Sequence, residues 1–341
     1  MINCLINKLM DNIEPNEVEL VEAFDEIFSG VADEIKATSF ITLLKEKGDL
    51  FEAKSSCLTS AIKSARSAVS KIKAIPDNFP IFEVLQFKNT PEYFDISFVM
   101  DIILASNDVL ISKYSFPLED NQSFKTLKSF GIASSNLEDD FYDNFEKTNF
   151  LYLNISDREP YCKYTSEILR RLPFDNVLSV SSKFLNPIRV KNQFIGVNSK
   201  EDVEKFANIC LNIGNQNTLI LNSNNDFPFA SINGETSVAE AWKNKIFTYV
   251  ITPELLGLVR YPIKDLLAEN REHNKETILN LFENKEKGAF YEFTVLNSAL
   301  ALYIVKKASS IMDGIALARK TIDSGLAKEK LTQLQEIYKY A

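Results

Sequence analysis

Glycine is scarce in this chain. The sequence has 10 glycines in 341 residues, whereas glycine makes up about 7% of an average protein. None occurs between Gly48 and Gly131. Loops that wrap a phosphate rely on glycine, because positive φ angles and close approach of the backbone are costly for other residues. The scarcity counts against nucleotide or sugar-phosphate chemistry in that part of the chain.

Histidine, paired cysteines and long apolar runs are also missing. The single histidine, His273, lies in the charged stretch ENREHNK, which argues against acid–base catalysis by histidine. Cys4, Cys57, Cys162 and Cys210 are far apart and form no CxxC pair, so we expect reduced thiols in a cytoplasmic protein. No apolar run is long enough to predict a membrane span. The first residues lack the basic and apolar segments of a signal peptide, so we expect none.

The remaining composition is that of a soluble globular protein. Hydrophobic residues make up 45% and charged residues 25% of the chain, and the length suffices for a large apolar core. The net charge is −9. Proteins that hold nucleic acid are usually basic, so the overall charge disfavours that class.

The pattern of apolar residues changes near residue 80. Residues 1–75 predict helices, the third of them from about Leu50 to Ala74. After Pro80, strand-like segments such as IFEVLQF and VLISKYS alternate with helical ones such as FDISFVMDIILAS. Residues 230–258 predict paired strands with turns at Gly234 and at Lys243-Asn244, and the C-terminal segment predicts helices. This alternation indicates an α/β fold with a mostly parallel mixed sheet.

Three segments resemble the anthranilate phosphoribosyltransferase family, of the glycosyltransferase family 3 and nucleoside phosphorylase group. NPIRVKNQFIGVNS (186–199) is similar to the family's NPxRPxxQxxGV, and ITPELLGL (251–258) to its TPExxGL. The stretch from ENKEKGAFYEF to TIDSG (283–325) is similar to the family's GxxGpxrdxvllNAaxaLyva region. The N-terminal helices fit as well, so the resemblance spans nearly the whole chain.

The resemblance implies two domains. A helical domain would comprise residues 1–75 with a returning segment near 155–184, and an α/β domain would comprise residues 76–154 and 185–341. It also implies a homodimer formed through the helical domain.

The family's phosphate loop is altered in this chain. The family segment GTGGDxxxTFNIST falls on LQFKNTPEYFDISF (85–98), anchored by FDIS. Its three glycines are replaced by Leu85, Phe87 and Lys88, and its aspartate by Asn89. Large side chains at these positions would occupy the space that the phosphates need. We expect Phe87, together with Phe116, to narrow the old pocket.

The metal-binding acids of the family are altered too. They fall near Pro228-Phe229, and the nearest carboxylate is Asp226, two residues away. A pyrophosphate leaving group needs Mg²⁺, and Mg²⁺ needs carboxylates. We therefore expect no catalytic and no metal-binding residue, and no cofactor unless the chain is an active enzyme, which would need Mg²⁺.

Several polar positions of the family remain as candidate substrate-binding residues. Asp95 and Ser97 match its NIS segment, and Lys113 is the only residue kept from its KHGNR motif. The LRRLP segment resembles the family's VRRELG, which contacts the carboxylate of the aromatic acid. Most candidates also have a purely structural explanation. Asp95 could cap a helix, and Lys113 could be a solvated surface residue. Arg170 and Arg171 could pair with acids, and Asn297 could satisfy buried backbone groups. The candidates are Asp95, Ser97, Lys113, Arg170, Arg171 and Asn297.

Three functions stay open. In the first, the chain would be a divergent homologue without phosphoribosyl transfer, retained as a binding or regulatory protein, with a phosphorylated small molecule as one candidate ligand. Alternatively, it is an active phosphoribosyltransferase of tryptophan biosynthesis, joining anthranilate and phosphoribosyl pyrophosphate with altered residues.

The third function is nucleic-acid binding, as in a branch of the same family. Between Ala53 and Ile75 the sequence has Lys54, Lys63, Arg66, Lys71 and Lys73 and no acid. Lys63, Arg66 and Lys73 would share one helix face, able to contact phosphates. The structural alternative is an ordinary solvated face.

Overall fold

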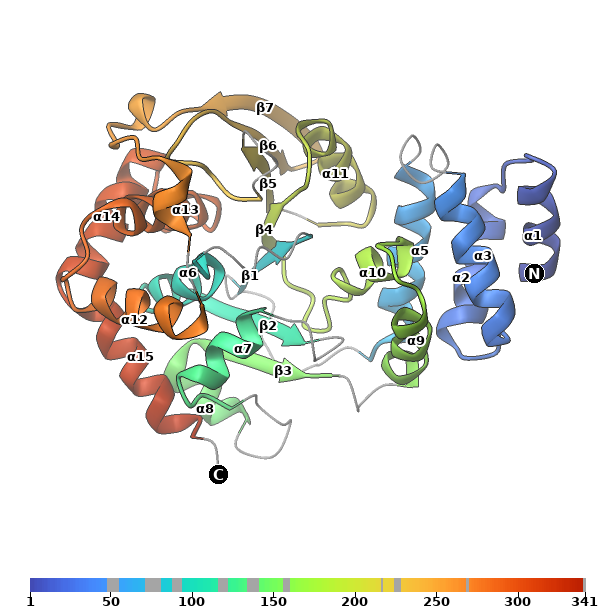
Figure 1. The fold of residues 1–341 in the computed structure, drawn as a ribbon, viewed down its shortest axis with the longest axis horizontal. Coiled ribbons are helices and arrows are strands. Elements are labelled where there is room, and N and C mark those ends of the chain that lie inside the picture. The colour runs from blue at the N-terminus through green and yellow to red at the C-terminus, as the bar shows by residue number, and fades with distance from the viewer. Residues whose placement is uncertain are drawn as a thin grey trace.

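The computed structural model describes residues 1–47, 55–70, 81–87, 94–115, 122–133, 141–155, 160–215, 217–223, 228–267 and 270–339. Within these residues, a seven-stranded sheet with the order β3-β2-β1-β4-β5-β6-β7 organises the chain (Figure 1). The pairs from β3 to β5 are parallel, and β6 and β7 pair antiparallel. The predicted α/β class with a mostly parallel mixed sheet is therefore confirmed. The strands are Ile81–Gln86 (β1), Leu110–Ser115 (β2), Phe150–Asn154 (β3), Asn192–Gly196 (β4), Asn217–Ser223 (β5), Thr236–Trp242 (β6) and Lys245–Ile251 (β7).

Helices surround the sheet on both sides. The helix α5 (Ser55–Ala68) corresponds to the third predicted helix and ends earlier than the predicted end at Ala74. Residues 71–80 lie outside the described residues. The α-helices are Ile2–Met10 (α1), Glu17–Phe28 (α2), Glu34–Glu46 (α3), Ser55–Ala68 (α5), Ile96–Ala105 (α6), Gln122–Ser129 (α7), Phe141–Thr148 (α8), Pro160–Arg171 (α9), Val177–Ser182 (α10), Lys200–Asn212 (α11), Arg271–Phe282 (α12), Ala289–Ile304 (α13), Ile311–Asp323 (α14) and Leu326–Ile337 (α15). Short 3₁₀ helices span Glu254–Leu256 (η2) and Ile263–Leu266 (η3).

The alternation of side chains along β1 separates two apolar cores. Phe82 and Val84 belong to the core that α6 and α13 cover, and Ile81 and Leu85 to the core shared with α5 and α11. Successive residues of a strand point to opposite faces, so a single strand serves both cores. The same alternation decides which of the two cores each polar side chain of β1 and β2 faces.

The helices α1, α2, α3 and α5 pack with α9 and α10 beside the sheet (Figure 1). Side-chain caps fix several starts: Asn16 and Glu19 form a reciprocal capping box at α2, and Asp33 accepts from the first turn of α3. This group joins the rest of the fold through α5, which packs against α11, and α11 in turn packs against β5 and β6.

Two backbone features shape the part of the sheet that contains β4, β6 and β7. Lys243 and Asn244 have φ angles of 47° and 60°, and they form the predicted turn between β6 and β7. At the end of β4, a Cβ on Gly196 would lie 1.9 Å from the carbonyl oxygen of Pro228. Glycine at 196 therefore allows the segment after residue 227 to cross the strand end.

None of the helices in the described ranges has the length and apolar character needed to cross a membrane. The structure has no disulfide among Cys4, Cys57, Cys162 and Cys210, and the last three of these are buried.

Candidate functional site

The carboxyl end of β1 is filled by aromatic side chains. Phe87 lies with its ring centroid 5.5 Å from that of Phe184 and 4.9 Å from that of Phe206. The Lys183 ammonium donates to the carbonyl oxygens of Gln86 (2.9 Å) and Phe87 (3.3 Å). The packed ring of Phe87 and the ammonium of Lys183 therefore lie where the resemblance places a phosphate loop. Residues 88–93 and Phe116 lie outside the described residues.

Asp95 caps the helix α6. Its Oδ1 accepts from the backbone N–H of Phe98 at 3.2 Å, and its Oδ2 accepts from the Thr126 hydroxyl at 2.6 Å. Its own N–H donates to Asn274 Oδ1 at 3.0 Å. Asp95 is buried, and these contacts are those of the helix-cap alternative.

Lys113 lies in a buried ion pair. Its ammonium is 2.5 Å from Asp101 Oδ2 and donates to Ser97 Oγ at 2.5 Å. Ser97 and Asp101 are four residues apart on α6, so both face the strand β2 that carries Lys113. The exposed fractions are 6% for Lys113 and 0% for Asp101. Burial raises the pKa of Asp101 to about 7, and the lysine acts against this rise.

The structure separates the arginines from Lys113 and its partners. Arg170 and Arg171 are exposed at the C-terminal end of α9. Arg171 forms an ion pair with Glu34 of α3. Within the described residues, Arg170 forms no ion pair.

Asn297 satisfies backbone groups in the core. It accepts from the N–H of Ala230 at 2.9 Å and donates to the carbonyl oxygens of Ala230 and Phe293, each at 3.0 Å. Next to Ala230, Phe229 is buried and stacks on Phe194 at 6.0 Å. The segment that would hold metal-binding acids is thus tied into the core at its described end.

The described residues do not fit a Mg²⁺ site. No three side chains of histidine, cysteine, aspartate or glutamate gather among them in a way that could hold a metal ion. The two buried carboxylates of this region are engaged: Asp95 accepts from Phe98 N–H and the Thr126 hydroxyl, and Asp101 is paired with Lys113. Asp226 lies outside the described residues. His273 lies in the first turn of α12.

The basic face predicted on the third helix is largely engaged. Arg66 is directed inward: its guanidinium donates to the carbonyl oxygens of Phe184 (2.8 Å) and Ile213 (3.0 Å) and to Asn215 Oδ1 (3.1 Å). Lys63 forms an ion pair with Glu17 at 3.2 Å. Lys54, Lys71 and Lys73 lie outside the described residues. Arg66 therefore cannot contribute to a phosphate-binding surface in this conformation.

Three charged residues escaped the sequence-based prediction: Glu83 and Asp101, which are buried, and Lys183, which is partly buried. Glu83 accepts from Gln193 Nε2 at 2.6 Å, and burial raises its pKa to about 7. Glu83 in IFEVLQ and Asp101 in FVMDIILA are lone acids within apolar elements, a signal that each needs a buried partner. Lys183, in SSKF, has no comparable signal in its neighbours.

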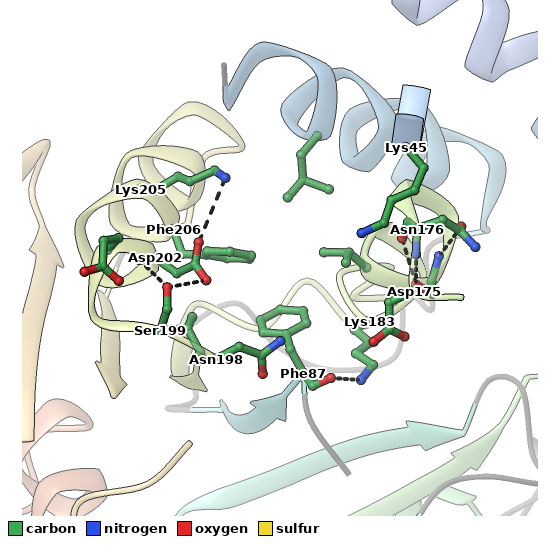
Figure 2. Close-up of a pocket in the computed structure, with 15 residues that line it drawn as sticks. Lys45, Phe87, Asp175, Asn176, Lys183, Asn198, Ser199, Asp202, Lys205 and Phe206 are labelled. Atoms are coloured by element: carbon green, nitrogen blue, oxygen red, sulfur yellow. Dashed lines mark hydrogen bonds and ion pairs between the residues drawn. The ribbon is translucent and has the colours of Figure 1, made fainter. Parts of the chain in front are cut away.

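A cavity of about 510 Å³ lies between α11 and a wall formed by α3, α5 and α10 (Figure 2). We call it the junction cavity. The candidate residues Asp95, Ser97, Lys113, Arg170, Arg171 and Asn297 are not among its lining. It is lined by Lys45, Leu58, Phe87, Asp175, Asn176, Ser179, Val180, Lys183, Val197, Asn198, Ser199, Glu201, Asp202, Lys205 and Phe206.

Known proteins resemble the chain over nearly its whole length. The model of a family described as "Glycosyl transferase family, a/b domain" matches residues 90–328. An anthranilate phosphoribosyltransferase of Acetivibrio thermocellus is 29% identical over 340 residues, covering 98% of this chain and 96% of that protein. One of Streptococcus pneumoniae (strain Hungary19A-6) is 27% identical over 337 residues, covering 98% of this chain and 99% of the other.

Solved structures agree on the fold. The anthranilate phosphoribosyltransferase of Thermus thermophilus superposes with a TM-score of 0.84 at 20% identity, covering 98% of this chain and 99% of that one. The enzyme of Saccharomyces cerevisiae in complex with PRPP and Mg also gives 0.84, at 18% identity, with 99% and 97% covered. At these identities, the likeness concerns the fold alone.

Proposed function

Because the chain belongs to the glycosyl transferase family whose α/β domain matches residues 90–328, we propose that it is a divergent anthranilate phosphoribosyltransferase-like protein. It binds a small molecule and does not transfer a phosphoribosyl group. The fold and the order of its segments are kept, and the surroundings of the inherited polar residues have changed.

The ion pair of Lys113 with Asp101 carries this proposal. The resemblance implies that this lysine contacts phosphate, yet here its ammonium bonds a carboxylate and a hydroxyl at 2.5 Å inside the core. An incoming phosphate would have to replace Asp101 and leave that carboxylate buried without its partner, which is expensive in a low-dielectric surrounding.

The end of β1 supports the proposal independently. A diphosphorylated sugar is bound by backbone N–H groups at close range, which requires an uncovered backbone. Here the ring of Phe87 packs against Phe184 and Phe206, which also stack on each other. Since the described residues also do not fit Mg²⁺, we derive no transfer step for this chain.

Calorimetric titration with phosphoribosyl pyrophosphate and Mg²⁺ tests the proposal. We expect neither heat nor a thermal shift at millimolar ligand, and no consumption of anthranilate. The Acetivibrio thermocellus relative, titrated in parallel, is the positive control. Micromolar binding that requires Mg²⁺, or turnover of anthranilate, would overturn the proposal in favour of an active enzyme with altered residues.

We also propose a homodimer formed through the helical domain, as the resemblance implies. Val31, two residues before the N-cap of α3, and Ile35, in the first turn of α3, are 77% and 75% exposed in the single chain. Apolar side chains exposed to this extent next to each other favour burial against a partner. Light scattering on the titration samples should give the mass of two chains, and a monomer at micromolar concentration would contradict the dimer.

A further inference from the structure

The ammonium of Lys183 lies on the junction cavity and forms no ion pair within the described residues. Its hydrogen-bond partners are two carbonyl oxygens, and its Nζ lies 5.5 Å from the centroid of the Phe87 ring. No carboxylate of the described residues is within ion-pairing distance of it. A partly buried ammonium with only neutral partners is incompletely compensated, so an anionic group of a ligand in the cavity would stabilise it.

The junction cavity as a whole is formally neutral, because three lysines and three carboxylates line it. Across the cavity, Lys205 and Asp202 of α11 pair with each other at 3.9 Å. On the opposite wall, Asp175 lies close enough to Lys183 to act on its charge, and Lys45 is on the same side (Figure 2). A multiply charged anion such as a pyrophosphate would meet the three carboxylates, so the lining favours a ligand that carries both signs.

The rest of the lining is mixed: Asn176, Ser179, Asn198 and Ser199 are polar, and five side chains form an apolar surface. Phe87 and Phe206 lie against each other at the inner end, and Leu58, Val180 and Val197 extend this surface. A ligand that fills the cavity would therefore bury an apolar body as well as its charged head.

We propose that the junction cavity binds an apolar α-amino acid as its zwitterion. The carboxylate is held by Lys183, the ammonium by Asp175, and the side chain packs on Phe87 and Phe206. Lys45 adds a second positive charge on the side of the carboxylate. This inference rests on the proposed function, since it supplies the small molecule that the protein binds.

The protonation of Lys183 gives a second signature. Burial lowers the pKa of Lys183 to about 8, and Asp175 acts against this decrease. A bound carboxylate favours the charged amine, so binding near pH 8 draws protons from the buffer. The binding enthalpy should then depend on the ionisation enthalpy of the buffer.

The test is calorimetry on the full chain with L-phenylalanine, L-leucine, 3-phenylpropionate and 2-phenylethylamine. The last two keep the apolar body of phenylalanine but lack the ammonium or the carboxylate. We expect both amino acids to bind, and each single-charge analogue to bind about tenfold more weakly than phenylalanine, as for the loss of one charge-assisted hydrogen bond.

Variants assign the two charges. Lys183→Met should weaken phenylalanine about tenfold and leave phenylethylamine unchanged, and Asp175→Asn should weaken phenylalanine and leave phenylpropionate unchanged. Asp175 is exposed, so its variant keeps the fold even if Lys183→Met does not. Lys163→Met, on the exposed side of α9 and outside the cavity, is the matched control.

Equal binding of phenylalanine and either analogue, or no binding of amino acids at millimolar concentration, would overturn the inference. This failure is separate from that of the proposed function, which depends on phosphoribosyl pyrophosphate and anthranilate. A chain that turns over anthranilate yet binds phenylalanine through Lys183 would refute the proposed function and keep the cavity assignment.

Discussion

Charged residues are used differently at the sheet and at the outer helices. On one face of the sheet, Lys113 pairs with Asp101, and on the other, Glu83 accepts from Gln193. These four side chains are buried. Each of them has partners of fixed geometry and little contact with water.

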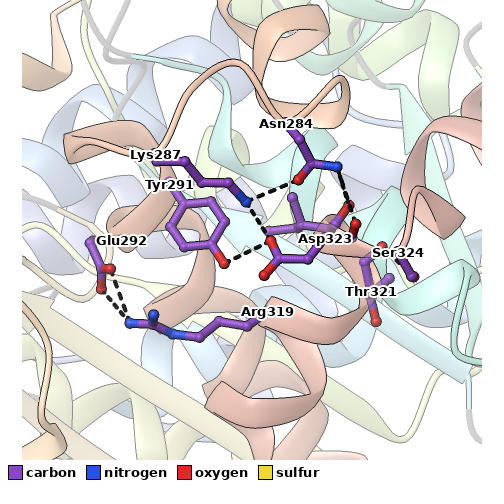
Figure 3. A network of polar contacts seen from close by, with 9 residues as sticks. Asn284, Lys287, Tyr291, Glu292, Arg319, Thr321, Asp323 and Ser324 are labelled. Carbon is purple, nitrogen blue, oxygen red and sulfur yellow. Dashed lines mark hydrogen bonds and ion pairs between the residues drawn. The ribbon is translucent and has the colours of Figure 1, made fainter.

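The outer helices carry a polar network at the surface (Figure 3). Asp323 at the end of α14 accepts from Lys287 Nζ at 2.5 Å and from the Tyr291 hydroxyl at 2.9 Å. Arg319 donates to both oxygens of Glu292 at 3.0 Å, and Glu292 is the buried member of the network, with its side chain 8% exposed. The Lys287 and Asp323 side chains are 47% and 50% exposed, so water surrounds this pair.

The two kinds of charge differ in the free-energy cost of losing a partner. A surface charge that loses its partner is solvated again, whereas a buried one keeps its desolvation cost. The residues that resemble a phosphate site belong to the buried class. They have been kept, we infer, because their loss would destabilise the fold.

The largest expected effect comes from breaking the buried pair. Lys113→Met leaves the Asp101 carboxyl in the core without its ammonium, and we expect the free energy of unfolding to fall by about 3–5 kcal/mol. Urea unfolding followed by circular dichroism measures this change. A loss below about 1 kcal/mol would mean that Lys113 is not needed by the fold, which would also weaken the proposed function.

A second substitution tests whether the loss of stability comes from the unpaired carboxylate of Asp101 or from lost packing. In Lys113→Met with Asp101→Leu, no buried charge remains, and most of the stability should return. If the double variant is as unstable as the single one, the cost comes from packing around β2 and α6 and not from the charge.

The intermediate effect is the pH dependence that Glu83 contributes. Its pKa in the folded protein, about 7, is above the ordinary value of 4.5. As the pH rises from about 4.5 to 7, the unfolded chain loses this proton first, so the free energy of unfolding falls by about 3 kcal/mol and then levels off. Asp101 adds a slope of the same sign.

Glu83→Gln isolates this contribution. The amide can still accept from Gln193, and it has no proton to lose, so the variant should match the wild type near pH 5 and exceed its stability at pH 8. Thermal or urea unfolding across this range gives the difference. Glu204→Gln, on the exposed side of α11, is the control. A parallel displacement of the Glu83→Gln curve at all pH values would show that Glu83 is ionised in the folded state.

The sequence sufficed for the layers of the fold and for the polar positions, but not for their partners. The alternation after Pro80 predicted the mixed sheet, and Lys243-Asn244 predicted the last hairpin. The end of α5 was misplaced, since helix periodicity alone does not say where tertiary packing stops. Lys113 was identified by resemblance, yet its pairing with Asp101 depends on the register of α6 against β2, which local sequence does not encode.

The junction cavity was beyond sequence reasoning for the same reason. Its walls come from α3, α10 and α11, which are distant in sequence. The position of the Lys183 ammonium is set by the end of α10 and by the carbonyl oxygen of Gln86 at the end of β1. Nothing in the segment SSKF indicates this position. Lone charges in apolar elements, such as Glu83, are the one local signal that could have been used.

The smallest effect is expected at the surface network. Asp323→Asn removes the charge that Lys287 contacts and keeps an acceptor for Tyr291, so the free energy of unfolding should fall by less than about 1 kcal/mol. Urea unfolding in low salt and in about 0.5 M salt measures it, and salt should reduce even this small loss, because it screens exposed charges. A salt-independent loss as large as that of Lys113→Met would contradict the comparison, since it would mean that the surface network contributes to stability as a buried one does.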